Sequence, residues 1–111
     1  FVAITDGTSN TLLIGERASR LGGAAWLGVP GGAVLASPLG EAPAAAYCLG
    51  AAGPRVPNGP GPRSGDFGSP HYGATNFALA DGGVRPVRPS VAPAVWAALA
   101  TVAGDEVAGE W

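Results

Sequence analysis

The feature that most constrains the fold is a hairpin pattern over residues 75–87. Residues 75–80 (TNFALA) alternate large apolar with small or polar residues, Asp81-Gly82 follows, and residues 83–87 (GVRPV) resume the apolar pattern. A period of two is typical of a strand with one buried face, and Asp-Gly favours a two-residue type I′ hairpin loop. Pro86 cannot donate to a ladder, so the second strand is expected at a sheet edge.

The segment after this hairpin has the spacing of an amphipathic helix. An apolar residue recurs at intervals of four, four and three, at Val91, Val95, Leu99 and Val102. Pro93 suits a first helical turn, Ser90 is a candidate cap and Gly104 is a stop signal. We therefore expect a helix over about residues 93–103.

The first sixteen residues read as two short apolar strands around a turn. Residues 1–4 (FVAI) and 11–16 (TLLIGE) flank the polar segment 5–10 (TDGTSN). Asp-Gly favours positive φ, and the Ser and Asn side chains can cap a tight turn. The predicted fold is α+β: a small antiparallel sheet from residues near 1–4, 11–16, 75–80 and 83–87, with the C-terminal helix packed on one face.

Residues 17–66 are rich in Gly, Ala and Pro and are expected to form loops with short strands. Gly and Pro make up 30 of the 111 residues (19 and 11), yet the hydrophobic fraction of 47% is that of a folding chain. The uncharged run at 21–40 is long enough to span a bilayer but is broken repeatedly by Gly and Pro. Residues 53–62 are a loop on any interpretation. We expect a single domain over 1–111, with 17–66 as an insertion and 67–111 as hairpin plus helix.

The charge pattern argues against nucleic-acid binding. The formal net charge is −2, and the six basic residues, all Arg, are scattered rather than arranged in a stripe. Cys48 is the single cysteine, so an intrachain disulfide is excluded.

Three segments resemble one known family. Residues 4–16 (ITDGTSNTLLIGE) are similar to a TDGTSNT…GE segment, and residues 67–85 to an H-X9-DG segment with nine residues between His71 and Asp81. Residues 90–107 are similar to the helix and tail that close such proteins. Together they resemble the planctomycete-type DUF1559 family. The motif residues, for which we expect a structural role, are Asp6, Gly7, Ser9, Asn10, Glu16, His71, Asn76, Asp81 and Gly82.

This resemblance implies the globular head of a pilin- or pseudopilin-like protein. In the family such a head follows a prepilin-type segment with one apolar helix, which is missing from this chain, so membrane anchoring would depend on that helix alone. The implied location is extracytoplasmic, in the cell envelope or secreted, with other envelope or pilin-like subunits as partners. We expect a non-enzymatic structural or interaction domain. The alternative is an extracellular carbohydrate- or solute-binding module that uses the loops of residues 17–66.

His71 and Asp81 also suggest a metal or acid–base site, because imidazole and carboxylate are common ligands and proton carriers. A strand over 75–80 would separate them by roughly 17–20 Å at about 3.3 Å per residue. We therefore expect Asp81 to bond turn amides and His71 to anchor the loop before the strand through a ring hydrogen bond.

Other site hypotheses have weaker support. No cofactor is expected; a calcium site would need the carboxylates Asp6, Glu16, Asp66 and Asp81 to converge, and no EF-hand spacing is present. Ser69 lies near His71 but not in a nucleophile elbow, so we do not expect hydrolase activity.

An aromatic sugar-stacking surface is a further possibility. The alternative interpretation is that Trp96 borders the apolar stripe of the helix and Trp26 fills the core. The aromatic residues concerned are Trp26, Trp96, Trp111, Tyr47 and Tyr72.

Overall fold

The computed structural model describes residues 3–22, 32–53, 55–104 and 111. The strands are β1 (Leu12–Gly15), β2 (Val34–Ser37), β3 (Gly40–Pro43), β4 (Thr75–Leu79) and β5 (Val84–Val87). The helix is α1 (Pro93–Ala98), and short 3-10 turns cover Thr8–Asn10, Ser19–Leu21 and Ala44–Tyr47. The predicted α+β class is confirmed.

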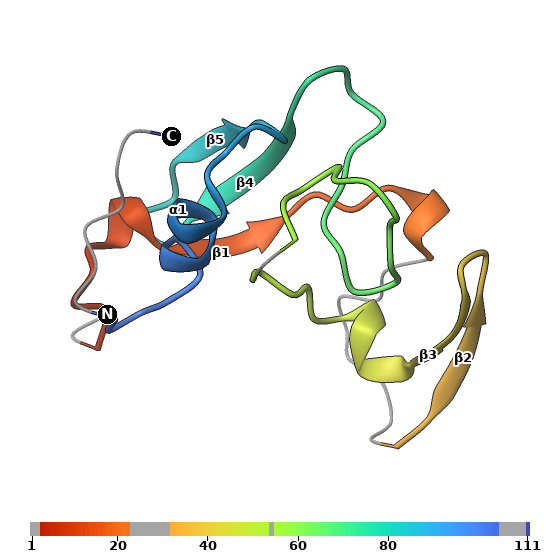
Figure 1. The fold of residues 1–111 in the computed structure, drawn as a ribbon. Coiled ribbons are helices and arrows are strands. Elements are labelled where there is room, and N and C mark those ends of the chain that lie inside the picture. The colour runs from red at the N-terminus through yellow and green to blue at the C-terminus, as the bar shows by residue number, and fades with distance from the viewer. Residues whose placement is uncertain (1–2, 23–31, 54, 105–110) are drawn as a thin grey trace.

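Three strands form an antiparallel sheet in the order β1-β4-β5 (Figure 1). Their bounds confirm the predicted strands at 11–16, 75–80 and 83–87 to within a residue at each end. β4 and β5 follow each other in the chain and are joined by a tight loop. β1 also pairs with β4, although the long 17–66 segment separates these two strands in the sequence. The central strand thus brings the two motif segments of the sequence side by side.

The strand predicted at residues 1–4 is wrong over the part that the structure describes. Residues 1–2 lie outside the described residues, and Ala3 and Ile4 belong to no strand. The backbone N–H of Thr5 instead donates to the carbonyl of Val102 at 2.8 Å. The N-terminal segment therefore pairs with the tail that follows α1, and β1 is an edge strand of the sheet.

The β4–β5 loop has three residues and not the two predicted. Leu79 N–H donates to Gly83 O at 2.8 Å, and Gly82 N–H donates to Leu79 O at 3.0 Å. Gly82 has a φ of +87°, whereas Asp81 is not among the described residues with positive φ. A type I′ loop would need positive φ at both residues, so the loop is a turn followed by a left-handed glycine.

Pro86 lies at the edge of the sheet, as predicted. Since Leu79 and Gly83 are a hydrogen-bonded pair, alternation along the ladder makes Asn76 and Pro86 a non-hydrogen-bonded pair. The imino nitrogen and the carbonyl of Pro86 therefore point away from β4. A proline at this position removes no ladder bond, and on the outer edge its carbonyl is an acceptor without an N–H donor from the same residue.

Helix α1 is shorter than the predicted 93–103, ending at Ala98 with Leu99 as its C-cap. The Leu99 carbonyl accepts the N–H of Leu12 at 2.8 Å, so it is not available to a further helical turn. The Thr101 hydroxyl lies 2.8 Å from the Ala98 carbonyl, which also competes with helical pairing.

The start of α1 and its apolar face also differ from the prediction. The N-cap residue is Ala92 and no side chain caps it, so the predicted cap at Ser90 is wrong, although Pro93 does occupy the first turn. Val102 is half exposed rather than part of the buried face. Trp96 and Leu99 are fully buried and form the centre of that face.

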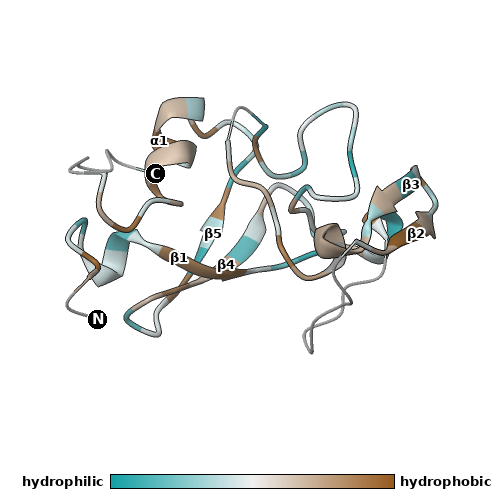
Figure 2. Cartoon of the chain, turned by 90° about the horizontal axis from the view of Figure 1, so that it is seen from below, coloured by the Kyte–Doolittle hydropathy of each residue, from teal (hydrophilic) through white to brown (hydrophobic). Residues whose placement is uncertain are grey.

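The core lies between α1 and one face of the sheet (Figure 2). The rings of Phe67, Phe77 and Trp96 meet edge to face, with centroids 5.1 to 6.0 Å apart. Such pairs contribute about 0.5–1.5 kcal/mol each beyond area burial. Val87 from β5 completes this buried cluster.

Residues 17–66 contribute the separate β2–β3 hairpin and several loops, and 55–62 contain no helix or strand, in agreement with the sequence. Arginines hold these loops: Arg17 donates to the carbonyls of Ala46 and Leu21, and Arg55 pairs with Asp66 at 3.0 Å. Cys48 is exposed. None of the helices in the described ranges is long and apolar enough to cross a membrane.

Candidate functional site

Four polar side chains from the two motif segments meet at one end of the β1–β4 pair, and we call them the motif junction: Glu16, Ser69, His71 and Asn76. Glu16 Oε1 accepts the Ser69 hydroxyl at 2.7 Å and lies 3.4 Å from His71 Nε2. Glu16 Oε2 accepts both the backbone N–H and the side-chain amide of Asn76, at 3.1 and 3.2 Å. The carboxylate therefore has a partner on each oxygen.

The backbone around Glu16 positions this carboxylate. Glu16 N–H donates to Asn76 O at 2.9 Å, which continues the β1–β4 ladder one residue beyond β1. On the other side, Gly68 N–H donates to Glu16 O at 3.2 Å. Residue 16 is thus clamped between the start of β4 and the loop that carries Ser69 and His71.

These hydrogen bonds lower the pKa of the Glu16 carboxyl below its ordinary value of 4.5. The bond from Ser69 has the largest effect; partial burial acts in the opposite direction, and the Asn76 amide and the charge on His71 add to the lowering. Glu16 is therefore held as the anion at neutral pH. A carboxylate with fixed donors and a depressed pKa is suited to holding structure rather than to taking up protons.

The junction lacks the order of a hydrolytic triad, although it contains a serine, a histidine and an acid. In a triad the imidazole lies between the hydroxyl and the carboxylate, but here the carboxylate lies between Ser69 and His71. The Ser69 hydroxyl also accepts the backbone N–H of His71 at 3.0 Å, and Ser69 is only 2% exposed. Its hydroxyl both donates and accepts a hydrogen bond within the fold, and it is buried away from any substrate.

The model of the family described as "Protein of unknown function (DUF1559)" matches residues 1–94, which include both motif segments and the whole motif junction. The chain belongs to the DUF1559 family. No curated protein and no solved structure matches it.

Asp6, from the first motif segment, binds the tail behind α1. Its Oδ2 accepts the Thr101 hydroxyl and the backbone N–H of Gly104, each at 2.9 Å. In the same turn Gly7 has a φ of +92° and its carbonyl accepts Asn10 N–H at 3.0 Å. Ser9 lies in the 3-10 turn between them. The first motif segment is thereby joined to the tail behind α1.

Asp81 and Gly82 lie at the opposite end of β4 from His71. Asp81 Oδ1 accepts Gly83 N–H at 2.8 Å, which is the turn bond predicted from the sequence. The Asp81 backbone N–H donates to Thr8 O at 3.1 Å and so ties the hairpin loop to the first motif segment. His71 and Asp81 therefore belong to two different contacts rather than to one shared site.

The four carboxylates of the calcium hypothesis have different partners. Asp6 bonds the C-terminal tail, Glu16 the motif junction and Asp81 its own turn, while Asp66 pairs with Arg55. Within the described ranges, no three His, Cys, Asp or Glu side chains are placed to hold a metal ion. The structure thus does not assemble the proposed oxygen-rich site.

The aromatic side chains that the structure describes do not gather into the stacking surface considered above. Trp96 is fully buried in the core, so it does more than border the helix stripe. Tyr72 is fully exposed in the loop after His71, and Trp111 packs against the core and Arg85. Trp26 and the Tyr47 side chain lie outside what the structure describes.

Sequence reasoning missed the residues that support the junction from the 53–62 loop. Asn58 has a φ of +56° and accepts Ser69 N–H and an Arg20 N–H, each at 3.0 Å. Arg20 also reaches the Ser69 carbonyl at 3.3 Å. The Asn58-Gly59 pair, a recognised turn signal, is the feature that could have pointed to this position. Ser69 was considered only as a nucleophile, and its role as the partner of Glu16 was not anticipated.

Proposed function

We propose that this chain is a non-enzymatic structural and interaction domain, the globular head of a pilin- or pseudopilin-like protein of the cell envelope. The observation that carries the proposal is an apolar row across the open face of the sheet. Ile14 is paired with Ala78 and Ala78 with Val84, so the three side chains point to the same face. Ile14 and Val84 are 66% and 67% exposed.

This face is the one that α1 leaves uncovered. Phe77 and Val87 point to the opposite face, where they pack against Trp96 of α1. In Figure 2, α1 lies on one side of the sheet and no other described helix or strand covers the far side. An apolar row with β-branched side chains at both ends, Ile14 and Val84, is suited to packing against an apolar helix.

The prepilin-type apolar helix that the family resemblance implies is an occupant of this kind. A single apolar helix lying over Ile14 and Val84 would form a second layer on the sheet, with α1 as the first. In this arrangement the apolar helix anchors the domain, and adjacent pilin-like subunits are its partners. The domain itself lies at an extracytoplasmic location.

The polar motif residues support the non-enzymatic part of the proposal. The carboxylates of Asp6, Glu16 and Asp81 accept from backbone or side-chain donors of the fold, and the single histidine of the sequence contacts Glu16. Nucleophilic catalysis needs a reactive group with an accessible reacting atom. The buried hydroxyl of Ser69 does not meet this requirement.

Site-specific photocrosslinking in the full-length protein, expressed in its native host, tests the proposal. A photoreactive amino acid is placed at Ile14 or at Val84, and at Tyr72 as a fully exposed control away from the row. We expect crosslinks from Ile14 and Val84 to the protein's own apolar helix or to an adjacent pilin-like subunit, and none from Tyr72.

Two results would contradict the proposal. One is that Ile14 and Val84 give no more crosslinked product than Tyr72. The other is a gene in which a lipoprotein or simple secretory signal, rather than a short basic leader and apolar helix, precedes this domain.

A further inference from the structure

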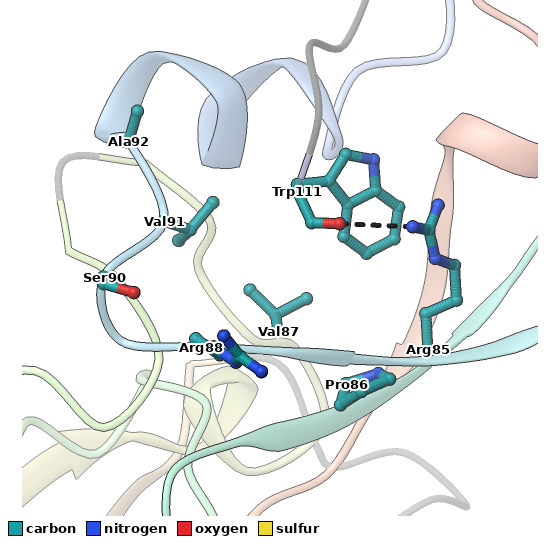
Figure 3. A pocket seen from close by; sticks show the side chains of 8 residues that line it. All are labelled: Arg85, Pro86, Val87, Arg88, Ser90, Val91, Ala92 and Trp111. Carbon is teal, nitrogen blue, oxygen red and sulfur yellow. Dashed lines mark hydrogen bonds between the residues drawn. The ribbon is translucent and has the colours of Figure 1, made fainter.

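A groove of about 520 Å³ runs between β5 and the segment that leads into α1, away from the motif junction and from the apolar row. Figure 3 shows Val91 and Trp111 on one side of it, and Arg85, Pro86 and Arg88 along β5 and its continuation. Its volume is within the usual range for small-ligand sites, about 300–1,000 Å³. Nothing in the proposed function uses this groove.

Two guanidinium groups line the groove, and none of its described lining residues is Asp or Glu. Arg85 is stacked over the Trp111 ring at 4.0 Å and donates to the Trp111 carbonyl at 3.2 Å, which fixes its side chain. The side chain of Arg88 is exposed and pairs with no other described residue. In contrast, Arg20 and Arg55 are occupied in holding loops.

The outer edge of β5 adds hydrogen-bond acceptors to these donors. The Pro86 carbonyl points away from β4, but proline has no N–H to accompany it. A peptide that adds as a strand needs both a donor and an acceptor from the edge, so strand addition is disfavoured here. A ligand hydroxyl, in contrast, can donate to that carbonyl or to the Ser90 hydroxyl, which also lines the groove.

We propose that this groove binds a hydroxylated carboxylate, specifically a uronic-acid unit of an acidic carbohydrate. The carboxylate pairs with Arg88, because a guanidinium fork matches a carboxylate with two parallel bonds, while Arg85 stays against Trp111 and adds positive charge to the groove. The sugar hydroxyls donate to Pro86 O and Ser90, and the ring packs against Val91. This site is independent of the proposed pilin-like function and does not require it.

Isothermal titration calorimetry with galacturonate and its trimer tests the proposal. The neutral galactose trimer and a glutamate-rich peptide are the comparison probes. The variants are Arg88→Ala and Arg88→Lys, with Arg63→Ala as control for an exposed arginine elsewhere, and circular dichroism verifies that each is folded. We expect the acidic trimer to bind the unmodified protein, with an affinity lowered about tenfold or more by Arg88→Ala.

The affinity of Arg88→Lys is expected to lie between those of the unmodified protein and Arg88→Ala, because lysine keeps the charge but lacks the guanidinium fork. Arg63→Ala is expected to leave the affinity unchanged. Equal affinity for monomer and trimer would identify a free sugar acid as the ligand, and higher affinity for the trimer a polymer; both agree with the proposal. It is overturned if the neutral trimer binds equally well, if the peptide binds more tightly than the acidic sugars, or if Arg88→Ala binds like the unmodified protein.

Discussion

Glu16 and Ser69 are joined by a 2.7 Å hydrogen bond although 53 residues separate them in the chain. With the bonds from Asn76, this contact fixes the loop before β4 against the end of β1. The two segments that resemble motifs of the DUF1559 family are therefore two halves of one structural contact in this chain. Glu16 and Ser69 thus serve as hydrogen-bond partners of each other within the fold.

The folded protein should lose stability in acid through Glu16. Its pKa is lowered on folding, mainly by the Ser69 hydroxyl, so below the ordinary value of 4.5 the unfolded chain binds the proton more readily. The contribution is fully present above that value and is lost as the pH falls through the folded pKa. Urea unfolding from about pH 7 to about pH 3 should show a steeper acid decline for the unmodified protein than for Glu16→Gln.

Glu41→Gln is the matched control for this measurement, because Glu41 is exposed on β3 away from the junction. It should keep the full acid decline. If Glu16→Gln declines as steeply as Glu41→Gln, Glu16 is not the group responsible.

Gly15→Ala should be strongly destabilising. A Cβ at Gly15 would overlap the rings of both Phe67 and Phe77, which are packed in the aromatic core. Overpacking of this kind costs about 1–3 kcal/mol in the free energy of unfolding. Gly65→Ala is the control, since nothing lies within 4 Å of a Cβ there. Equal unfolding free energies for the two variants would show that β1 does not approach the core as described.

Thr101→Val should loosen the tail behind α1. It removes the hydroxyl that Asp6 accepts at 2.9 Å and leaves that carboxylate one donor short, at a cost of about 1–3 kcal/mol. Thr101→Ser keeps the hydroxyl and should retain most of the stability. Hydrogen exchange at the Gly104 amide, which donates to the same carboxylate, should rise in Thr101→Val alone. Identical exchange in both variants would contradict the Asp6 contact.

The local parts of this fold could be predicted from the sequence. The alternation at 75–80 and the Asp-Gly pair identified the β4–β5 hairpin, because strand period and turn chemistry are encoded within a few residues. The loop type was wrong because Asp81 adopts an ordinary negative φ and Gly82 alone supplies the left-handed residue. Neighbouring residues do not distinguish these two loops.

The non-local parts could not be predicted. The length of α1 depends on the Leu99 carbonyl being taken by Leu12, which lies 87 positions earlier (99 minus 12). Similarly, nothing near Glu16 indicates that its partners are Ser69 and Asn76. Such pairings depend on tertiary packing, which overrides local propensity. The family resemblance marked the participating residues but not which of them touch.

A double-mutant cycle on Glu16 and Ser69 tests the central claim, that the two motifs form one structural junction, most directly. The free energy of unfolding in urea is measured for the unmodified protein, Glu16→Ala, Ser69→Ala and the double variant. We predict that each single change costs about 1–3 kcal/mol and that the double variant loses less than their sum by about 1 kcal/mol or more. Losses that add to within about 0.3 kcal/mol would contradict the junction.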